Sequence, residues 1–266
     1  MYYINDKEYR CSVAVTLDIF NDRWKLAIIW HLLDGDKRFK DLHEIINEIT
    51  QKTLTVKLKE LEENPYIGFE KEFLRWMLSD GAAAFLMTNK KNENGLNLRV
   101  EWLEGFSFAN EMEACMYSAS EKQKDGSLKG YMEYTPDEIM NRSILSIKQD
   151  VKLLSEHIVP LGGVGLKAAL DKHGVKSDEV DYFLPHMSSH FFKDKIFQRL
   201  IENGNGIPYD KWFVNLSTVG NVGAASVYLM VDELYHSGKL KPGDKILLLV
   251  PESARFSYMY SLLTVC

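Results

Sequence analysis

Two polar side chains, His186 and Asn221, each come after a run of residues that is typical of a buried strand. His186 follows the predicted strand 181–184, and Asn221 lies in a polar turn between the run 211–215 and a helix that begins at residue 224. An imidazole and an amide side chain can each donate a hydrogen bond to a ligand. The sequence therefore predicts that the two side chains converge on one site.

Ordinary structural roles are the alternatives for both residues. A histidine after a proline is usually structural, and an asparagine in a Gly-Asn turn often serves because it tolerates left-handed backbone. His190 comes four residues after His186, which suits a metal pair on a helix, but no third ligand is apparent. The GGVG run at 162–165 lacks the preceding strand of a phosphate loop. The sequence therefore predicts neither a metal nor a cofactor.

The composition is that of a globular protein, with 45% apolar and 26% charged residues in a chain of 266. No apolar run approaches the roughly 18 residues of a membrane span, and the polar N-terminus lacks a signal core, so we expect a cytoplasmic protein without membrane contact. A net charge of -6 argues against general affinity for nucleic acid but permits a local basic face. Cys11, Cys115 and Cys266 are far apart, which suits a reducing compartment.

The first quarter of the chain is predicted to contain three short helices, over residues 27–33, over 38–46 and onward from a capping Thr50. The third helix has no acidic residue before Glu60, and one face of its first turns carries amides, hydroxyls and lysines: Gln51, Lys52, Thr53, Thr55 and Lys57. Such a face suits a recognition helix, whose lysines contact phosphates while Gln and Thr reach base edges. The alternative for the region 38–60 is an ordinary solvent-exposed face.

Residues 9–67 resemble the HxlR family of winged-helix transcription regulators. The matching positions are Cys11, Thr16-Leu17-Asp18, Trp24-Lys25, Gly35, Arg38-Phe39, Leu42, the run 49–55, Leu58 and Glu60-Leu61-Glu62. The resemblance implies binding to palindromic DNA as a dimer. It also implies a redox- or electrophile-sensing role for Cys11, for which a plain buried cysteine is the alternative. It ends at Tyr66-Ile67, where we find neither a wing hairpin nor a closing dimerisation helix.

The pattern changes at Gly68. Asp80-Gly81 predicts a hairpin between apolar strands 74–78 and 82–87, and residues 96–102 are expected to form another strand. Residues 106–134 are expected to be irregular. Thr135, followed by Pro136 and Glu138, predicts the start of a helix that continues to about residue 155, and a second helix is expected over 163–172.

From there the predicted strands and helices alternate. The expected order is strand 181–184, helix 191–203, strand 211–215, helix 224–237, strand 245–250 and strand 258–265. Alternation that ends in a pair of strands predicts a layered α/β domain with a mixed sheet.

This second region resembles condensing enzymes of the ketoacyl-ACP synthase III type, which have the thiolase fold. LSDGAAAFLM is similar to the hairpin that closes the N-terminal half of that fold. LPHMSSHFF is similar to the segment with the catalytic histidine, and NLSTVGNVGAASVYLMVDELYHSGKLKPGDKILLL to the segment with the catalytic asparagine. The resemblance implies that His186 and Asn221 bind a thioester carbonyl and stabilise the enolate left by decarboxylation. The implied partners are acyl and malonyl thioesters of ACP or coenzyme A.

Three departures from that family bear on activity. Its nucleophilic cysteine belongs to the N-terminal half of the fold, whereas Cys115 comes after the closing hairpin and Cys11 belongs to the other resemblance. Residues 251–256, PESARF, stand where a glycine-rich loop is expected. Absence of the N-terminal half would leave one face of the sheet open, so we expect a homodimer or a partner chain that supplies the missing half.

We therefore expect an α/β, incomplete thiolase-like layered fold over residues 68–266, preceded by a small all-α winged-helix-like fragment over residues 1–67. The favoured hypothesis is an acyl-thioester condensing (acyltransferase) module fused to a DNA-binding fragment. We expect it to be inactive in condensation by itself, although decarboxylation alone is conceivable. The alternatives are a DNA-binding transcription regulator whose second region senses an acyl thioester, and a non-functional product of gene fusion.

Overall fold

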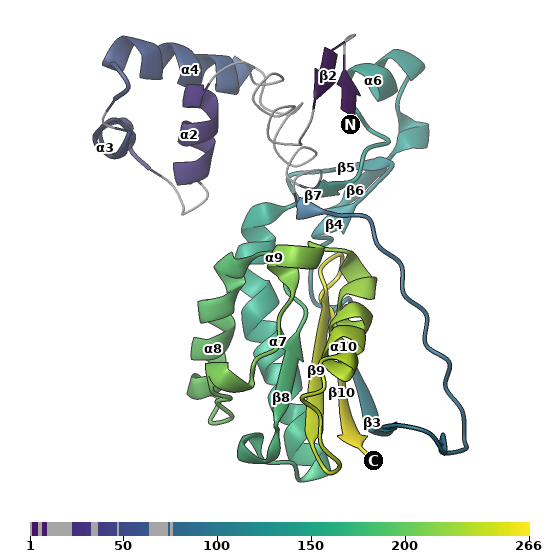
Figure 1. Ribbon diagram of the computed structural model, residues 1–266. Coiled ribbons are helices and arrows are strands. Elements are labelled where there is room, and N and C mark those ends of the chain that lie inside the picture. Colours follow the sequence, from purple (N-terminus) through teal and green to yellow (C-terminus); the bar gives the residue numbers. More distant parts are fainter. Residues whose placement is uncertain are drawn as a thin grey trace. The chain divides into compact units, whose positions relative to one another are not determined.

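The computed structural model describes residues 2–4, 7–9, 23–32, 37–46, 48–63, 74 and 77–266 (Figure 1). These residues belong to two compact units, Met1–Phe69 and Glu70–Cys266. Cys11 and the segment after residue 63 in which a wing would begin lie outside the described residues.

The described part of the first unit contains a short hairpin and three helices. Strand β1 (Tyr2–Ile4) pairs antiparallel with β2 (Lys7–Tyr9), and the helices are α2 (Arg23–Leu32), α3 (Phe39–Ile45) and α4 (Gln51–Glu63). The three helices match the predicted ones. The hairpin was not predicted, so the unit is not wholly helical. Thr50 caps α4 as expected, because its hydroxyl oxygen accepts a 3.1 Å hydrogen bond from the backbone N–H of Thr53.

Apolar side chains from the three helices form the core of the first unit. Its buried members are Ile28, Leu42, Ile46, Ile49 and Leu54. Phe39 and Ile45 of α3 lie outside this core and are 40% and 46% exposed. Phe39 instead stacks on the ring of His43, with ring centroids 6.5 Å apart.

The second unit is built on a four-stranded mixed sheet. Its strands are β3 (Leu98–Ser107), β8 (Tyr182–Pro185), β9 (Lys245–Glu252) and β10 (Ser257–Val265), in the order β3-β10-β9-β8. β8 runs parallel to β9, whereas β10 is antiparallel to both β9 and β3. The predicted strand 211–215 is reduced to one parallel bridge between Trp212 and Phe183.

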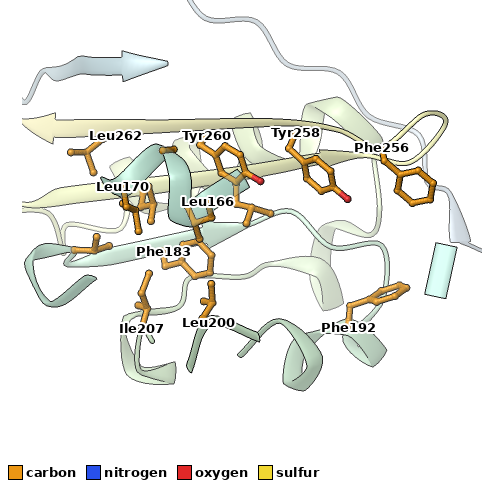
Figure 2. Packing of buried hydrophobic residues seen from close by; sticks show 14 of the residues in the cluster. Leu166, Leu170, Phe183, Phe192, Leu200, Ile207, Phe256, Tyr258, Tyr260 and Leu262 are labelled. Atoms are coloured by element: carbon orange, nitrogen blue, oxygen red, sulfur yellow. The ribbon is translucent and has the colours of Figure 1, made fainter. Parts of the chain in front are cut away.

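Helices pack on both faces of this sheet, which confirms the predicted layered α/β class (Figure 1). One face carries α7 (Val151–His173) and α8 (Lys193–Glu202), and their shared core includes Leu166, Leu200, Phe183 and Tyr258 (Figure 2). The other face carries α10 (Ser226–His236), whose Val227, Met230, Val231 and Leu234 pack on alternate strand residues such as Ile246 and Val265. Alternation of side chains along each strand thus supplies two separate cores.

The GGVG run is a helix–sheet contact inside α7. A Cβ at Gly162 would lie 2.9 Å from the Tyr258 ring, and one at Gly165 would lie 2.6 Å from the Tyr260 hydroxyl. Tyr260 donates a 2.7 Å hydrogen bond to the Gly162 carbonyl. Absence of side chains at these positions is therefore what lets two large tyrosines pack against the helix.

Short elements complete the second unit. They are β4 (Met116–Tyr117), β5 (Ser120–Lys122), β6 (Leu128–Gly130), α6 (Pro136–Asn141), β7 (Lys148–Gln149), α9 (Leu216–Val219) and the short 3-10 helices η1 (Tyr131–Glu133), η2 (Ser177–Glu179), η3 (His190–Phe192), η4 (Tyr209–Lys211) and η5 (Gly223–Ala225). β4 pairs with β7, and β5 pairs with β6. None of the described helices is long and apolar enough to cross a membrane.

Besides the strand at 211–215 and the irregular segment 106–134, which contains β4, β5 and β6, two further predictions about local structure were wrong. The helix predicted over 135–155 ends at Asn141, and α7 begins anew at Val151 because Asp150 caps it by accepting a 3.0 Å hydrogen bond from the Leu153 N–H. The described residues around Asp80-Gly81 form no pair of strands: Leu74 and Met77 have helical backbone, and residues 82–87 form no strand. None of the described strands pairs with residues 77–87.

Candidate active site

A cavity of about 320 Å³ lies in the second unit, among α7, α8 and the carboxyl ends of β8 and β9. His186 and Asn221, predicted from the sequence to converge, both contribute to its wall. The other lining residues are mainly apolar and include Leu74, Met77, Leu78, Met116, Leu154, Ile158, Val159, Gly162, Phe192, Ile196, Leu200, Leu249 and Tyr258.

His186 is positioned by the parallel ladder between β8 and β9. It follows the last residue of β8, and its backbone N–H donates a 2.8 Å hydrogen bond to the carbonyl oxygen of Leu249 in β9. The residue is 9% exposed, and burial lowers the pKa of its imidazole to about 4. Near neutral pH the ring is therefore uncharged, with one nitrogen as donor and the other as acceptor.

Asn221 is positioned by the turn between α9 and η5. It is 6% exposed, and its side-chain oxygen accepts a 3.1 Å hydrogen bond from the backbone N–H of Gly223. Because a backbone N–H can only donate, this contact identifies the amide oxygen and leaves the NH2 group as the other end. Among the described residues, the structure records no acceptor for that NH2, so it can donate to a ligand in the cavity.

The segment at residues 79–81 supports the Asn221 turn from the other side. The backbone N–H of Ser79 donates a 2.7 Å hydrogen bond to the Asn221 carbonyl. A Cβ at Gly81 would lie 2.6 Å from the Val222 side chain, and one at Gly220 would collide with the Ser79 hydroxyl. Sequence reasoning assigned this segment to a hairpin and missed the contact, because only the packing brings it to Asn221.

The PESARF segment, residues 251–256, begins in the last two residues of β9 and continues into a turn. Its Pro251, Glu252 and Ser253 line the cavity. The Glu252 carboxylate accepts hydrogen bonds from the backbone N–H groups of Ala254 and Arg255, which fixes the turn. The buried Gln149 side chain donates a 2.9 Å hydrogen bond to the Ser253 hydroxyl, and both residues line the cavity. Sequence reasoning did not single out Gln149.

Cys115 is fully buried and does not line the cavity. Its thiol donates a 3.3 Å hydrogen bond to the Asp150 carbonyl. Burial, followed by the nearby Asp150 carboxylate, raises the pKa of this thiol to about 12. It is therefore a protonated core cysteine near neutral pH, and no thiol of the described residues lines the cavity.

The side chain of His190 contacts α9. Its Nε2 lies 2.9 Å from the Ser217 hydroxyl, to which it is hydrogen-bonded. Over the residues that the structure describes, no three His, Cys, Asp or Glu side chains gather closely enough to hold a metal ion.

The five candidate DNA-contacting residues lie on α4 in the first unit. Gln51, Lys52 and Thr55 are exposed, whereas Thr53 and Lys57 are half-buried. The Thr53 hydroxyl pairs with that of Thr50, and the Thr55 hydroxyl donates to the Gln51 carbonyl. Gln51 and Lys52 are thus the exposed members of the set with long side chains that can extend away from the helix.

Family models match the two parts of the chain separately and confirm both resemblances. Residues 19–72 match the HxlR-like helix-turn-helix model. Residues 170–251 match the model of the C-terminal part of 3-oxoacyl-[acyl-carrier-protein] synthase III, and this segment contains His186 and Asn221.

Individual relatives divide in the same way. An uncharacterized HTH-type transcriptional regulator of Bacillus subtilis, YdeP, is 42% identical over 68 residues, which cover 26% of this chain and 53% of the relative. A beta-ketoacyl-[acyl-carrier-protein] synthase III of Clostridium perfringens is 25% identical over 175 residues, 65% of this chain and 47% of the relative. Among solved structures, the tetronic acid condensing enzyme AbyA1 superposes with a TM-score of 0.48 at 18% identity, covering 63% of this chain and 47% of that one.

The chain spans about half the length of the curated relatives that it matches. Its two matched regions follow one another without overlap. The chain therefore joins a region similar to HxlR-like helix-turn-helix regulators to a region similar to the C-terminal part of ketoacyl-ACP synthase III.

Proposed function

We propose that the second unit binds acyl or malonyl thioesters and stabilises negative charge on the thioester oxygen with His186 and Asn221. The observation that carries the proposal is that both side chains line one cavity while each keeps a donor available to it. Buried donors with fixed positions stabilise charge strongly because little reorganisation is needed when the charge forms.

The reaction that this arrangement supports is decarboxylation of a malonyl thioester. The bond between the α-carbon and the carboxylate breaks, and its electron pair enters the thioester enolate as carbon dioxide leaves. His186 and Asn221 donate hydrogen bonds to the enolate oxygen. The α-carbon then takes a proton from water, which gives an acetyl thioester.

We expect no condensation by this chain alone. Condensation requires a nucleophile that holds the first acyl group next to the enolate. Cys115 does not meet this requirement, because its thiol is buried outside the cavity and has a pKa of about 12. A homodimer or a partner chain that brings a reactive cysteine to the cavity would restore the complete reaction.

The test is release of carbon dioxide from malonyl-coenzyme A by the purified chain. His186→Ala and Asn221→Ala are each expected to lower the rate about 100-fold, the usual effect of removing one oxyanion donor. His236→Ala and Asn94→Ala, both at exposed positions, serve as matched controls and should retain the wild-type rate. Wild-type rates in both His186→Ala and Asn221→Ala would exclude the proposal. Formation of an acyl-cysteine and a 3-ketoacyl product would show that the chain catalyses condensation by itself, contrary to the expectation.

A second candidate function is sequence-specific DNA binding by the first unit. The observation in its favour is that α4 exposes Gln51 and Lys52 at its capped N-terminal turn. In this hypothesis, an acyl thioester bound to the second unit changes the affinity for DNA. The unit would then belong to a transcription regulator.

Selection from a pool of random duplexes tests this second candidate. We expect enrichment of a palindromic sequence, weaker binding by Lys52→Ala, and a salt dependence of binding reduced by about one phosphate contact. Lys90→Ala, an exposed lysine of the second unit, is the matched control. Equal binding to all sequences, or none, would rule out this candidate; an unchanged affinity on adding acyl-coenzyme A would rule out the sensing role.

A further inference from the structure

An apolar segment of the second unit, residues 82–88, lies on the protein surface. Its sequence is AAAFLMT, and every residue from 78 to 95 is exposed. Leu86 and Met87 are 91% and 75% exposed. In Figure 1 the segment belongs to the extended trace that leads to β3. A run of exposed apolar side chains of this kind is typical of an interaction surface.

The main chain of the segment is also unpaired within the part of the protein that the structure describes. None of the described strands pairs with it, and no backbone–backbone hydrogen bond is recorded for residues 82–87. Both ends are held, because the Ser79 N–H is bonded to the Asn221 carbonyl and the Asn92 N–H to the Asn97 side chain. A held row of unpaired N–H and C=O groups is a template for a second strand.

Helix α10 supports one face of the segment. The Phe85 ring packs edge-on against Tyr228 of α10, with centroids 5.0 Å apart, and 47% of Phe85 is still exposed. Two strands alone are at best marginally stable in water, but packing on a helix stabilises them. A strand that pairs with this segment therefore gains support from α10.

The segment is complementary to itself in the antiparallel direction. When Phe85 lies opposite Phe85 of a second copy, the small residues 82–84 lie opposite the larger residues 86–88. Asp80 then lies opposite the basic pair at residues 90–91. A parallel pair in register would instead place like charges opposite one another and large side chains opposite large ones. Side-chain size and charge thus both favour the antiparallel pair.

We propose that residues 82–88 form an antiparallel strand pair with the same residues of a second copy of this chain. The occupant is a second copy because the segment itself supplies the matching sizes and charges. The paired stretch is short, so the dimer is weak, with a dissociation constant on the order of 10 µM. The proposal does not depend on the proposed decarboxylation, since none of residues 82–88 lines the cavity.

Sedimentation velocity of the purified chain between about 1 and 100 µM tests the proposal, and we expect a monomer–dimer equilibrium. Leu86→Lys should weaken dimerisation about tenfold, because it introduces a charge into the apolar pairs. Leu145→Lys, at a residue that is 57% exposed and lies outside the segment, is the matched control. Asp80→Lys should weaken dimerisation about threefold by facing the basic pair. Glu93→Lys makes the same charge change at an exposed position beyond the paired stretch and should leave dimerisation unchanged.

Cysteine cross-linking tests the register. The starting chain carries Cys11→Ser and Cys266→Ser, so that only the buried Cys115 remains. In this chain, a mixture of Ala84→Cys and Leu86→Cys molecules should form disulfide-linked dimers faster than either variant alone. The reason is that directly opposite residues are closer than diagonal ones in an antiparallel pair.

A monomer at every concentration would overturn the proposal and leave the segment to a chain of different sequence. A dimer that Leu86→Lys does not weaken, an assembly larger than a dimer, or equal cross-linking in the single and mixed samples would overturn it as well. Circular dichroism checks that each variant is folded. Asp80→Lys and its control Glu93→Lys provide a second reading if Leu86→Lys is not.

Discussion

The backbone N–H of Ser79 donates a 2.7 Å hydrogen bond to the carbonyl oxygen of Asn221. This hydrogen bond joins two residues far apart in the sequence, and it holds the turn that carries the Asn221 side chain against the segment around Ser79. The same segment continues past α10, where the Phe85 ring packs edge-on against Tyr228 with centroids 5.0 Å apart. Support of the Asn221 turn by residues 79–81 gives the first prediction.

Gly81→Ala is expected to displace the Asn221 turn. The added Cβ would lie 2.6 Å from the Val222 side chain, a collision that we expect to lower the free energy of unfolding by about 1–3 kcal/mol. Val222→Ala in the same chain removes the colliding methyl groups and should recover part of the loss. Urea unfolding of the two single variants and the double variant measures this coupling, and Ala83→Val at an exposed position is the control. Strict additivity of the two changes would contradict the contact.

His186 should make folding stability depend on pH. Its folded-state pKa of about 4 is below the ordinary value of about 6.5, so between these values the unfolded chain binds a proton that the folded chain does not. The contribution is fully present above about pH 6.5, and it falls by on the order of 2–3 kcal/mol as the pH approaches 4. Urea unfolding across this range should show a weaker pH dependence in His186→Gln. His236→Gln, at a residue with a 70% exposed side chain, should leave the dependence unchanged; identical curves for His186→Gln and the wild type would refute the prediction.

Gly165→Ala in α7 should destabilise the protein, although alanine is the better helix former. In an open helix the change would stabilise by about 1 kcal/mol. Here the new Cβ would lie 2.6 Å from the Tyr260 hydroxyl, so we expect a net loss of about 1–3 kcal/mol. Tyr260→Phe removes the colliding oxygen and should reduce the loss caused by Gly165→Ala. Val164→Ala, at a neighbouring residue that is 55% exposed, should change the unfolding free energy little. A gain in stability for Gly165→Ala would show that this contact is wrong.

Cys115 should resist alkylation in the folded protein. Its thiol is fully buried with a pKa of about 12, and the thiolate is the reactive form. Iodoacetamide at pH 8, followed by peptide mass spectrometry, should label the half-buried Cys266 first and Cys115 only after unfolding in urea. Equal labelling of Cys115 and Cys266 without urea would contradict the assigned burial.

The candidate site could be predicted only in part. The apolar run before His186 and the polar turn around Asn221 identify both donors, since such patterns are set by neighbours in the sequence. Gln149 and Ser79 gave no such signal, because their places beside the cavity depend on a β4–β7 pair and on packing against a distant turn. The Asp80-Gly81 hairpin was wrongly predicted because a turn signal does not supply the neighbouring strand that a hairpin needs in order to be buried.

By itself the sequence determined the alternation of strands and helices after residue 180, apart from the strand expected at 211–215, together with the cap at Thr50 and the similarity of each region to a different family. These features depend on local periodicity and on motifs. The tertiary structure alone decided that α7 runs unbroken through Gly162, that Cys115 is a core thiol, and that His186 and Asn221 share an apolar cavity. The physical reason is that burial, close approach and pKa depend on which distant residues surround a group, and those neighbours exist only once the sheet and its helices have packed.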